Sequence, residues 1–171
     1  LSLAERFARA LVKLGVKPGD RISLCLPNVP QFPIAFFGAL KAGAVVVPTN
    51  PLYTQPELEH QLNDAGVKVV VVIDPLYNTV AAVRPRTPTV EQVIVAGVSD
   101  YFPKPLAIAY AIREARENRS KPHFEPKVAL RDASVHRFKD VIGSTRDARG
   151  FVEAFPLPAP AKPDDLALLQ Y

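Results

Sequence analysis

The fold is decided by residues 44–73, which read AVVVPTNPLYTQPELEHQLNDAGVKVVVVI. Two apolar, β-branched runs at residues 44–47 and 67–73 enclose a polar segment with helical periodicity, and such runs are typical of strands. Thr54 and Glu57 stand at the spacing of a capping box, which marks the start of that helix. The second run is apolar on both faces, as in a parallel strand covered by helices on both sides. The stretch therefore predicts a strand–helix–strand unit of a parallel sheet.

The residues before this stretch show the same alternation. Apolar residues recur at helical spacing behind a serine cap in residues 3–14, and residues 21–26 form a short strand-prone run. A second helix is predicted to start at Pro30, because proline suits the first helical position. Pro33 is expected to remove a backbone hydrogen bond one turn into that helix. Its apolar residues at helical spacing are Ile34, Phe37 and Leu40.

The residues after the stretch extend the pattern. Another helix, weaker than the others, is predicted from Asp74, and residues 93–96 read as a fourth strand. Strands that alternate with helices are typical of a parallel sheet with right-handed crossover connections. The chain is therefore predicted to be an α/β protein, with a Rossmann-like layered core over residues 1–100 in which helices flank a mostly parallel sheet.

The composition changes in residues 101–154, which we predict to be a helical and loop insert. Apolar residues crowd the first half of residues 101–118 and charged residues fill the second half. We expect a helix whose first turns pack under the sheet; the alternative is a helix that dips its apolar end into a membrane surface or a partner. Residues 135–141 are too short and mixed for one assignment, and residues 145–154 are a candidate helix.

The last segment, residues 155–171, is predicted to be a connector followed by a strand. It begins with FPLPAPAKP, and four prolines in nine residues favour an extended chain. Asp164 and Asp165 are expected to cap this connector, with magnesium binding as the alternative. The apolar run at residues 166–171 then predicts a strand.

Composition excludes several classes of protein. The chain has 171 residues, 48% of them hydrophobic and 22% charged, which is typical of one globular domain. The formal charge is +4, but 21 basic residues are scattered among 17 acidic ones, so no nucleic-acid footprint is expected. No apolar run approaches the roughly 20 residues of a membrane-spanning helix. The single cysteine, Cys25, excludes an internal disulfide and favours a reducing, cytoplasmic compartment.

No catalytic, cofactor-binding or metal-binding residue is predicted. His60 falls on the solvent face of its predicted helix, and His123 and His136 have no paired ligand at metal spacing. Cys25 lies between two leucines in a strand, where a small buried residue is expected, although spacing alone leaves a Cys–His pairing open. The glycines match neither GxGxxG nor GxxxxGK[ST], so the sheet is expected to have no phosphate-binding loop of its own.

Several motifs nevertheless carry a resemblance. Residues 11–72 resemble the N-terminal part of acyl-CoA synthetases of the adenylate-forming, AMP-binding superfamily. The most specific piece is LKAGAVVVPTNP at residues 40–51, and GVKPGDR at residues 15–21 is similar to the turn before the family's first sheet strand. KPDDLALLQY at residues 162–171 resembles the strand that leads into the family's phosphate loop. VHRFKD at residues 135–140 looks most like long-chain fatty-acid CoA ligases.

The resemblance implies the N-terminal subdomain of the adenylate-forming fold, taken from a long-chain fatty-acid CoA ligase. Such a ligase converts fatty acid, ATP and CoA into acyl-CoA, AMP and pyrophosphate through an acyl-adenylate, with magnesium present. The resemblance places the phosphate loop and the catalytic residues after Tyr171. The chain itself is therefore expected to be an inactive fragment on which no cofactor binds.

The resemblance also implies the partners, which are the fatty acid, ATP and CoA, together with the remaining domains of the same enzyme. A homodimer and a weak membrane contact through residues 101–118 are further options, and a cytoplasmic protein is expected, with a position at the membrane periphery as the alternative. Two other functions stay open. One is an adenylate-forming ligase for aryl or amino acids, and the other is a non-catalytic interaction or dimerisation module of the same fold.

Overall fold

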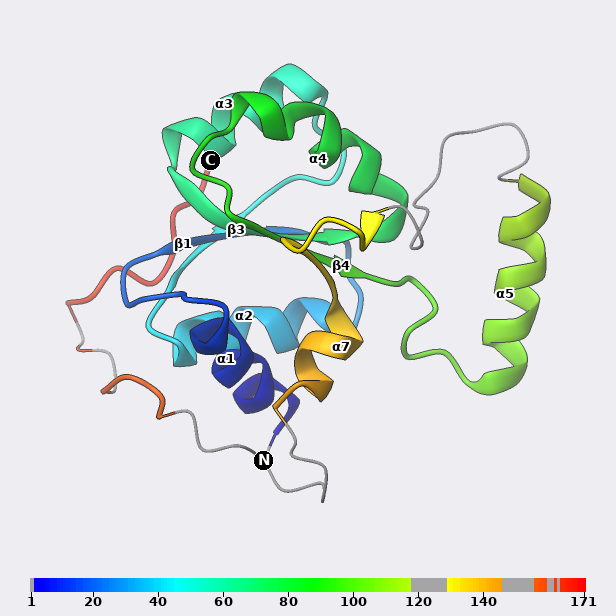
Figure 1. The fold of residues 1–171 in the computed structure, drawn as a ribbon, viewed down its shortest axis with the longest axis horizontal. Coiled ribbons are helices and arrows are strands. Elements are labelled where there is room, and N and C mark those ends of the chain that lie inside the picture. Colours follow the sequence, from blue (N-terminus) through cyan, green and yellow to red (C-terminus); the bar gives the residue numbers. More distant parts are fainter. Residues whose placement is uncertain (1, 118–128, 146–155, 160–161, 163) are drawn as a thin grey trace.

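A parallel sheet forms the centre of the structure (Figure 1). The computed structural model describes residues 2–117, 129–145, 156–159, 162 and 164–171. In this part of the chain five strands pair in the order β2-β1-β3-β4-β5, and every pair is parallel. The strands are β1 (Arg21–Cys25), β2 (Val45–Pro48), β3 (Val67–Ile73), β4 (Gln92–Ala96) and β5 (Val135–Arg137).

Helices cover both faces of this sheet (Figure 1). One face carries α1 (Leu3–Lys13), α2 (Gln31–Lys41) and α7 (Phe138–Gly143). The other face carries α3 (Gln55–Asp64) and α4 (Tyr77–Val83), with the short 3-10 helices η1 (Asp74–Leu76) and η2 (Arg84–Arg86) flanking α4. The predicted α/β fold, with a layered parallel sheet between helices, is confirmed.

The strand β3 shows why the sheet needs helices on both sides. Val69 and Val71 point into one core cluster, which they share with residues of α1, α2 and α7. Val70 and Val72 point into a second cluster, which they share with residues of α3 and α4. All four side chains are fully buried. The unbroken valine run therefore supplies apolar side chains to two cores at once, as predicted.

Two helix starts follow the predicted capping chemistry. Ser2 Oγ accepts a hydrogen bond from the Glu5 amide at 3.2 Å at the start of α1. At the start of α3, the Thr54 amide donates to Glu57 Oε2 at 2.8 Å, and the Thr54 side chain caps the third residue of the helix. These contacts satisfy backbone groups that have no partner within the helix, so the local sequence fixes both start points.

The predictions for α2 need two corrections. Pro33 is only the third residue of the helix, where the amide has no intrahelical acceptor, so proline removes no hydrogen bond there. Phe37 is 55% exposed, and the buried side of the helix carries Ala35, Gly38 and Ala39 instead. The reason is the close crossing with α1, since a Cβ on Gly38 would lie 2.7 Å from Phe7 Cδ1.

Residues 135–143, which the sequence left unassigned or placed in the insert, belong to the layers. β5 pairs with β4 through the register Val93–Val135, Ile94–His136 and Val95–Arg137. The helix α7 follows immediately and buries Phe138, Val141 and Ile142 against the same face as α1. The candidate helix over residues 145–154 lies outside the described residues, apart from Thr145.

The helix predicted within residues 101–118 forms as α5 (Lys104–Glu117), but its first turns are not buried under the sheet. Leu106 and Ile108 are exposed, and Figure 1 shows α5 outside both helical layers, beyond β4. The expected packing of these turns is therefore wrong for this chain. The ring of Phe102, in the turn before α5, lies edge to face against the ring of Tyr110, with 5.7 Å between the ring centroids. This contact packs the preceding turn against α5.

The predicted strand at residues 166–171 is present as a short pairing on the outer edge of β2. Leu168 forms a parallel bridge with Val46. The Val46 amide donates to the Ala167 carbonyl oxygen, and the Leu169 amide donates to the Val46 carbonyl oxygen, each at 2.9 Å. The chain end is also tied to α3, because Tyr171 Oη donates a hydrogen bond to Asp64 Oδ2.

Candidate functional site at the carboxyl edge of the sheet

The strand order indicates where a ligand would bind. In open α/β sheets, ligands lie outside the carboxyl ends of the strands, at the point where the strand order reverses. In the order β2-β1-β3-β4-β5 that point lies between β1 and β3. These strands lead into residues 26–30 and into Asp74, respectively. This edge of the sheet is therefore the first place to look for a site.

Gln31 is a fully buried polar residue at this edge. It is the first residue of α2, and its Nε2 donates a hydrogen bond to the Gly97 carbonyl oxygen at 2.7 Å. The bond joins the start of α2 to the turn after β4. Gln31 Oε1 is also buried, and it has no hydrogen-bond partner in the described part of the protein. Leaving such an acceptor unpaired costs about 1–3 kcal/mol, so the oxygen would accept a hydrogen bond from any donor that reached it.

A pocket of about 240 Å³ opens beside the turn after β4. Asp100 Oδ2 accepts a hydrogen bond from the Gly97 amide at 2.8 Å, and Asp74 Oδ1 accepts one from the Val98 amide at 3.3 Å. Lys139 Nζ lies 3.5 Å from Asp100 Oδ1. The two carboxylates therefore hold the loop after β4 in place. Because both carboxylates accept hydrogen bonds from backbone amides of the loop, a role in stabilising the loop is favoured over a role as a catalytic pair.

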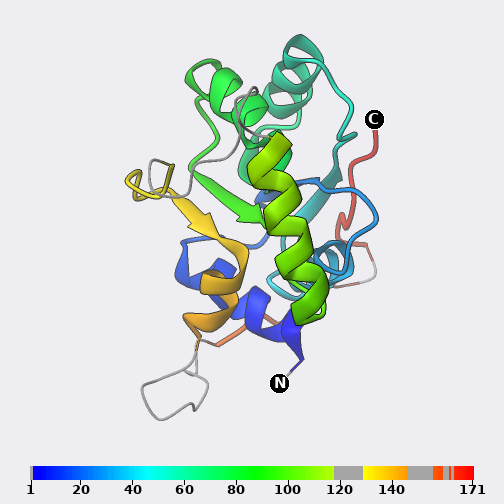
Figure 2. The ribbon, with the colours of Figure 1, turned by 90° about the vertical axis from the view of Figure 1, so that its right-hand side faces the viewer.

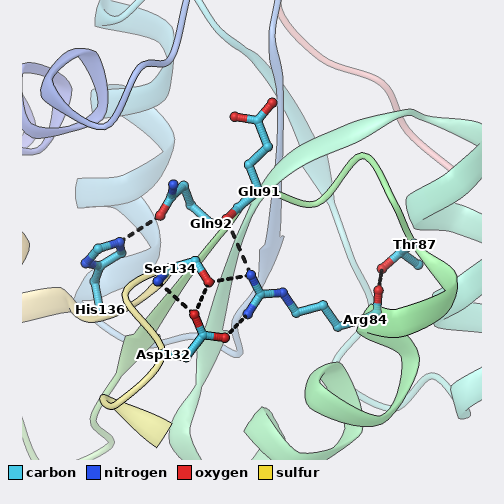
Figure 3. Close-up of polar contacts among 7 residues, drawn as sticks. All are labelled: Arg84, Thr87, Glu91, Gln92, Asp132, Ser134 and His136. Atoms are coloured by element: carbon cyan, nitrogen blue, oxygen red, sulfur yellow. Dashed lines mark hydrogen bonds and ion pairs between the residues drawn. The ribbon is translucent and has the colours of Figure 1, made fainter.

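A second polar cluster lies at the amino edge of the sheet (Figure 3). Arg84 Nη1 lies 2.8 Å from Asp132 Oδ2, and Arg84 Nη2 donates hydrogen bonds to Ser134 Oγ and, at 3.4 Å, to the Glu91 carbonyl oxygen. Asp132 Oδ1 accepts hydrogen bonds from both the amide and the hydroxyl group of Ser134. We call Arg84, Asp132 and Ser134 the Arg84 cluster. It connects the end of α4 to the segment that enters β5.

The electrostatics of the Arg84 cluster are those of a structural contact. Hydrogen bonds from Ser134, and then the charge of Arg84, hold the pKa of Asp132 below its usual range. Nearby, His136 Nε2 lies 2.7 Å from Gln92 Oε1 (Figure 3), and burial lowers the pKa of His136, which favours the neutral ring. The polar atoms of the cluster are already paired with one another, which favours a clamp between α4 and β5 over a binding site.

The structure places the residues that the sequence screened for chemistry. His60 is exposed on α3, as predicted, and His136 lies in β5 against Gln92. His123 lies outside the described residues. Cys25 is buried in the second core cluster, and burial raises the pKa of its thiol to about 12. A thiol that stays protonated is not a nucleophile, so Cys25 is the small buried residue that was predicted.

The paired carboxylates near the chain end act as a cap. Asp164 and Asp165 are both exposed, and Asp165 Oδ2 accepts a hydrogen bond from the Lys162 amide at 2.7 Å. Across the described residues, no three His, Cys, Asp or Glu side chains come together in a way that could hold a metal ion. That no residue of this chain is catalytic, cofactor-binding or metal-binding stays a prediction.

The sequence patterns did not predict the residues whose polar contacts stabilise the carboxyl and amino edges of the sheet. Gln31 had a local signal, because it is a polar residue that opens an otherwise apolar helix. Arg84 and Asp132 had no such signal, because β4 and α5 lie between them in the chain. Only the folded sheet shows that they meet.

Comparisons with known proteins point to one family. The whole chain, residues 1–171, matches the family model described as "AMP-binding enzyme". A long-chain-fatty-acid–CoA ligase of Bacillus subtilis is 35% identical over 172 residues, which cover 100% of this chain and 28% of that protein. One from Escherichia coli O6:H1 is 35% identical over 160 residues, covering 92% of this chain and 26% of that protein. The chain thus spans about a quarter of the length of the curated relatives that it matches.

Solved structures agree with the fold. An anthranilate CoA ligase in complex with anthranoyl-AMP has a TM-score of 0.68 at 21% identity, covering 97% of this chain and 25% of that one, and this likeness shows the fold alone. A long-chain-fatty-acid-CoA ligase from Archaeoglobus fulgidus has a TM-score of 0.53 at 32% identity, covering 54% of this chain and 18% of that one.

Proposed function

The chain belongs to the AMP-binding enzyme family, and from that premise we propose that it is the N-terminal scaffold of a long-chain fatty-acid CoA ligase. The whole enzyme would activate a fatty acid with ATP to an acyl-adenylate and then transfer the acyl group to CoA. One observation carries the proposal: the 35% identity to the Bacillus subtilis ligase extends over the whole chain. Sequence identity at this level over every helix and strand is stronger support for a shared substrate class than similarity of fold alone.

The role proposed for these residues is to build the sheet and to hold its carboxyl edge. Gln31, Asp74 and Asp100 fix the loop after β4 through hydrogen bonds to backbone atoms. Charge stabilisation at ATP phosphates needs backbone donors and magnesium ligands, and it supplies most of the rate enhancement in phosphoryl chemistry.

The described residues do not fit a magnesium or ATP site. The carboxylates at the carboxyl edge already accept hydrogen bonds from loop amides, and no described set of side chains could hold a metal. We therefore assign the contacts to ATP, magnesium and CoA to the remainder of the enzyme and derive no reaction step from this chain. We further propose that the enzyme is cytoplasmic and forms a homodimer.

Two experiments test the proposal. The protein encoded by the complete reading frame that contains these residues should exchange pyrophosphate into ATP when given palmitate, but not when given benzoate or an amino acid. The chain of residues 1–171 alone should show no exchange above a blank without protein, because several kcal/mol of transition-state stabilisation is missing from it.

The outcomes separate the alternatives. Exchange with an aryl or amino acid, and none with fatty acids, would mean that the enzyme is a ligase for aryl or amino acids and not for fatty acids. No exchange with any acid in the complete protein would favour a non-catalytic module of the same fold. Exchange by residues 1–171 alone would show that the catalytic contacts lie within them.

A further inference from the structure

The helix α5 exposes apolar side chains to solvent. Leu106, Ile108 and Ile112 are 51%, 63% and 53% exposed. Figure 2, which turns the molecule so that α5 faces the viewer, shows the helix lying across the outside of the layers. The helix has 14 residues, and helices of this length are marginal in water unless one face packs against something. With 3.6 residues per turn, Leu106 lies on a different side of α5 from Ile108 and Ile112, so it is the exposed side with the two isoleucines that indicates a binding partner.

One side of α5 has basic residues at its ends and isoleucines between them. Lys104, Ile108, Ile112 and Arg116 follow one another at intervals of four residues, so they lie along one side of the helix. All four are exposed, and in the described residues neither Lys104 nor Arg116 takes part in an ion pair. We call these four residues the α5 ridge.

We propose that the α5 ridge binds the surface of an anionic lipid bilayer. The isoleucines would enter the interfacial region, and the basic side chains would reach the phosphate groups, as in other amphipathic helices that lie in the plane of a membrane. The acidic residues of α5, Glu114 and Glu117, stand outside the four-residue spacing of the ridge. None of the described helices is long and apolar enough to span a bilayer. The inference rests on the proposed function, since the long acyl chain of the substrate partitions into bilayers.

Charge argues against a second copy of this chain as the partner. If two α5 ridges packed antiparallel, Lys104 of one copy would meet Arg116 of the other. If they packed parallel, each basic residue would meet its own equivalent. Both arrangements place like charges together across the contact, which is unfavourable. An anionic surface instead complements both ends of the ridge at once.

The test is flotation of the complete protein that contains residues 1–171 with vesicles of phosphatidylcholine, with and without about 30% phosphatidylserine. We expect binding to the anionic vesicles that weakens at high salt. Lys104→Gln/Arg116→Gln should lower the partition coefficient about 25-fold, from about fivefold for each basic residue lost. Ile108→Ser/Ile112→Ser should abolish co-flotation. Urea midpoints equal to that of the wild type will show that these surface variants are folded.

Matched controls test whether position matters. Lys17→Gln/Lys41→Gln removes two exposed charges outside α5, and Leu52→Ser removes an 87% exposed apolar side chain from the loop after β2. Both should float as the wild type does. Equal losses in these controls, equal binding to neutral vesicles, or no binding by the wild type would overturn the proposal. Self-association that Ile108→Ser/Ile112→Ser removes, without vesicle binding, would assign the ridge to a protein contact instead. None of these results depends on exchange activity, so the ligase proposal fails or stands separately.

Discussion

The rings of Phe7 in α1 and Phe138 in α7 stack with their centroids 5.0 Å apart and their planes 27° apart. Both side chains are fully buried, in the core cluster between the helices and the sheet. The contact joins α1 to the helix that follows β5, so the VHRFKD segment contributes Phe138, together with the buried Val135, to the core.

Phe138→Ala should therefore destabilise the protein strongly. Removing a buried aromatic side chain costs about 3–5 kcal/mol, because apolar burial is lost and a cavity remains. Urea unfolding followed by circular dichroism measures the change. Phe37→Ala, at an exposed position of α2, is the control and should cost about 1 kcal/mol or less. Similar costs for the two variants would mean that α7 does not pack as described.

Val71→Asp should prevent folding or cost several kcal/mol. Val71 is fully buried in the middle of β3, and a carboxylate there would have no partner. His60→Ala, on the exposed side of α3, should change stability by only about 0.5 kcal/mol. Equal urea midpoints would contradict the central position of β3.

Cys25 should be unreactive in the folded protein. Burial raises the pKa of its thiol to about 12, so at about pH 8 almost no thiolate is present, and the side chain is also shielded from reagents. Titration with a disulfide reagent should detect no thiol in native buffer and one per chain in urea. Rapid labelling of the native protein would show that β1 opens.

The Arg84 cluster should contribute stability that depends on pH. The pKa of Asp132 is lowered in the folded protein, so its stabilising effect is fully present above the ordinary pKa range of a carboxyl group and is lost as the pH falls through the lowered value. Asp132→Asn should therefore unfold at lower urea than the wild type at about pH 7. The difference should be about 1 kcal/mol or less, since half of the Asp132 side chain is exposed.

The same two proteins should converge in strong acid, where the wild-type carboxylate is protonated as well. Asp164→Asn, an exposed carboxylate outside the cluster, should match the wild type at every pH. A difference between Asp132→Asn and the wild type that persists unchanged into acid would point to packing and not charge.

Local features of the fold were predictable from the sequence. The capping box of Thr54 and Glu57 and the valine run of β3 act through neighbours in the chain, so their sequence patterns fixed the bounds of α3 and β3 closely. The sequence pattern of α2 did not predict which side of the helix is buried, because that side depends on how closely α1 approaches Gly38.

Contacts between distant residues were not predictable. The strand β5 has three residues, and its identity as a strand depends on β4 as a partner. The pairing of Arg84 with Asp132 likewise exists only after β4 and β5 have come together. The helix α5 was predicted, but its exposure was not, because the apolar residues in its sequence suit a buried helix equally well.

The pairing of residues 167–169 with β2 has a consequence for solution behaviour. The outer edge of β2 presents the apolar sequence VVVP, and an unpaired strand edge can accept a strand from another molecule. Two hydrogen bonds to Val46 cover the middle of that edge. Residues 167–169 therefore act as a guard strand, and their release would leave the amide and the carbonyl group of Val46 unpaired at the edge of the sheet.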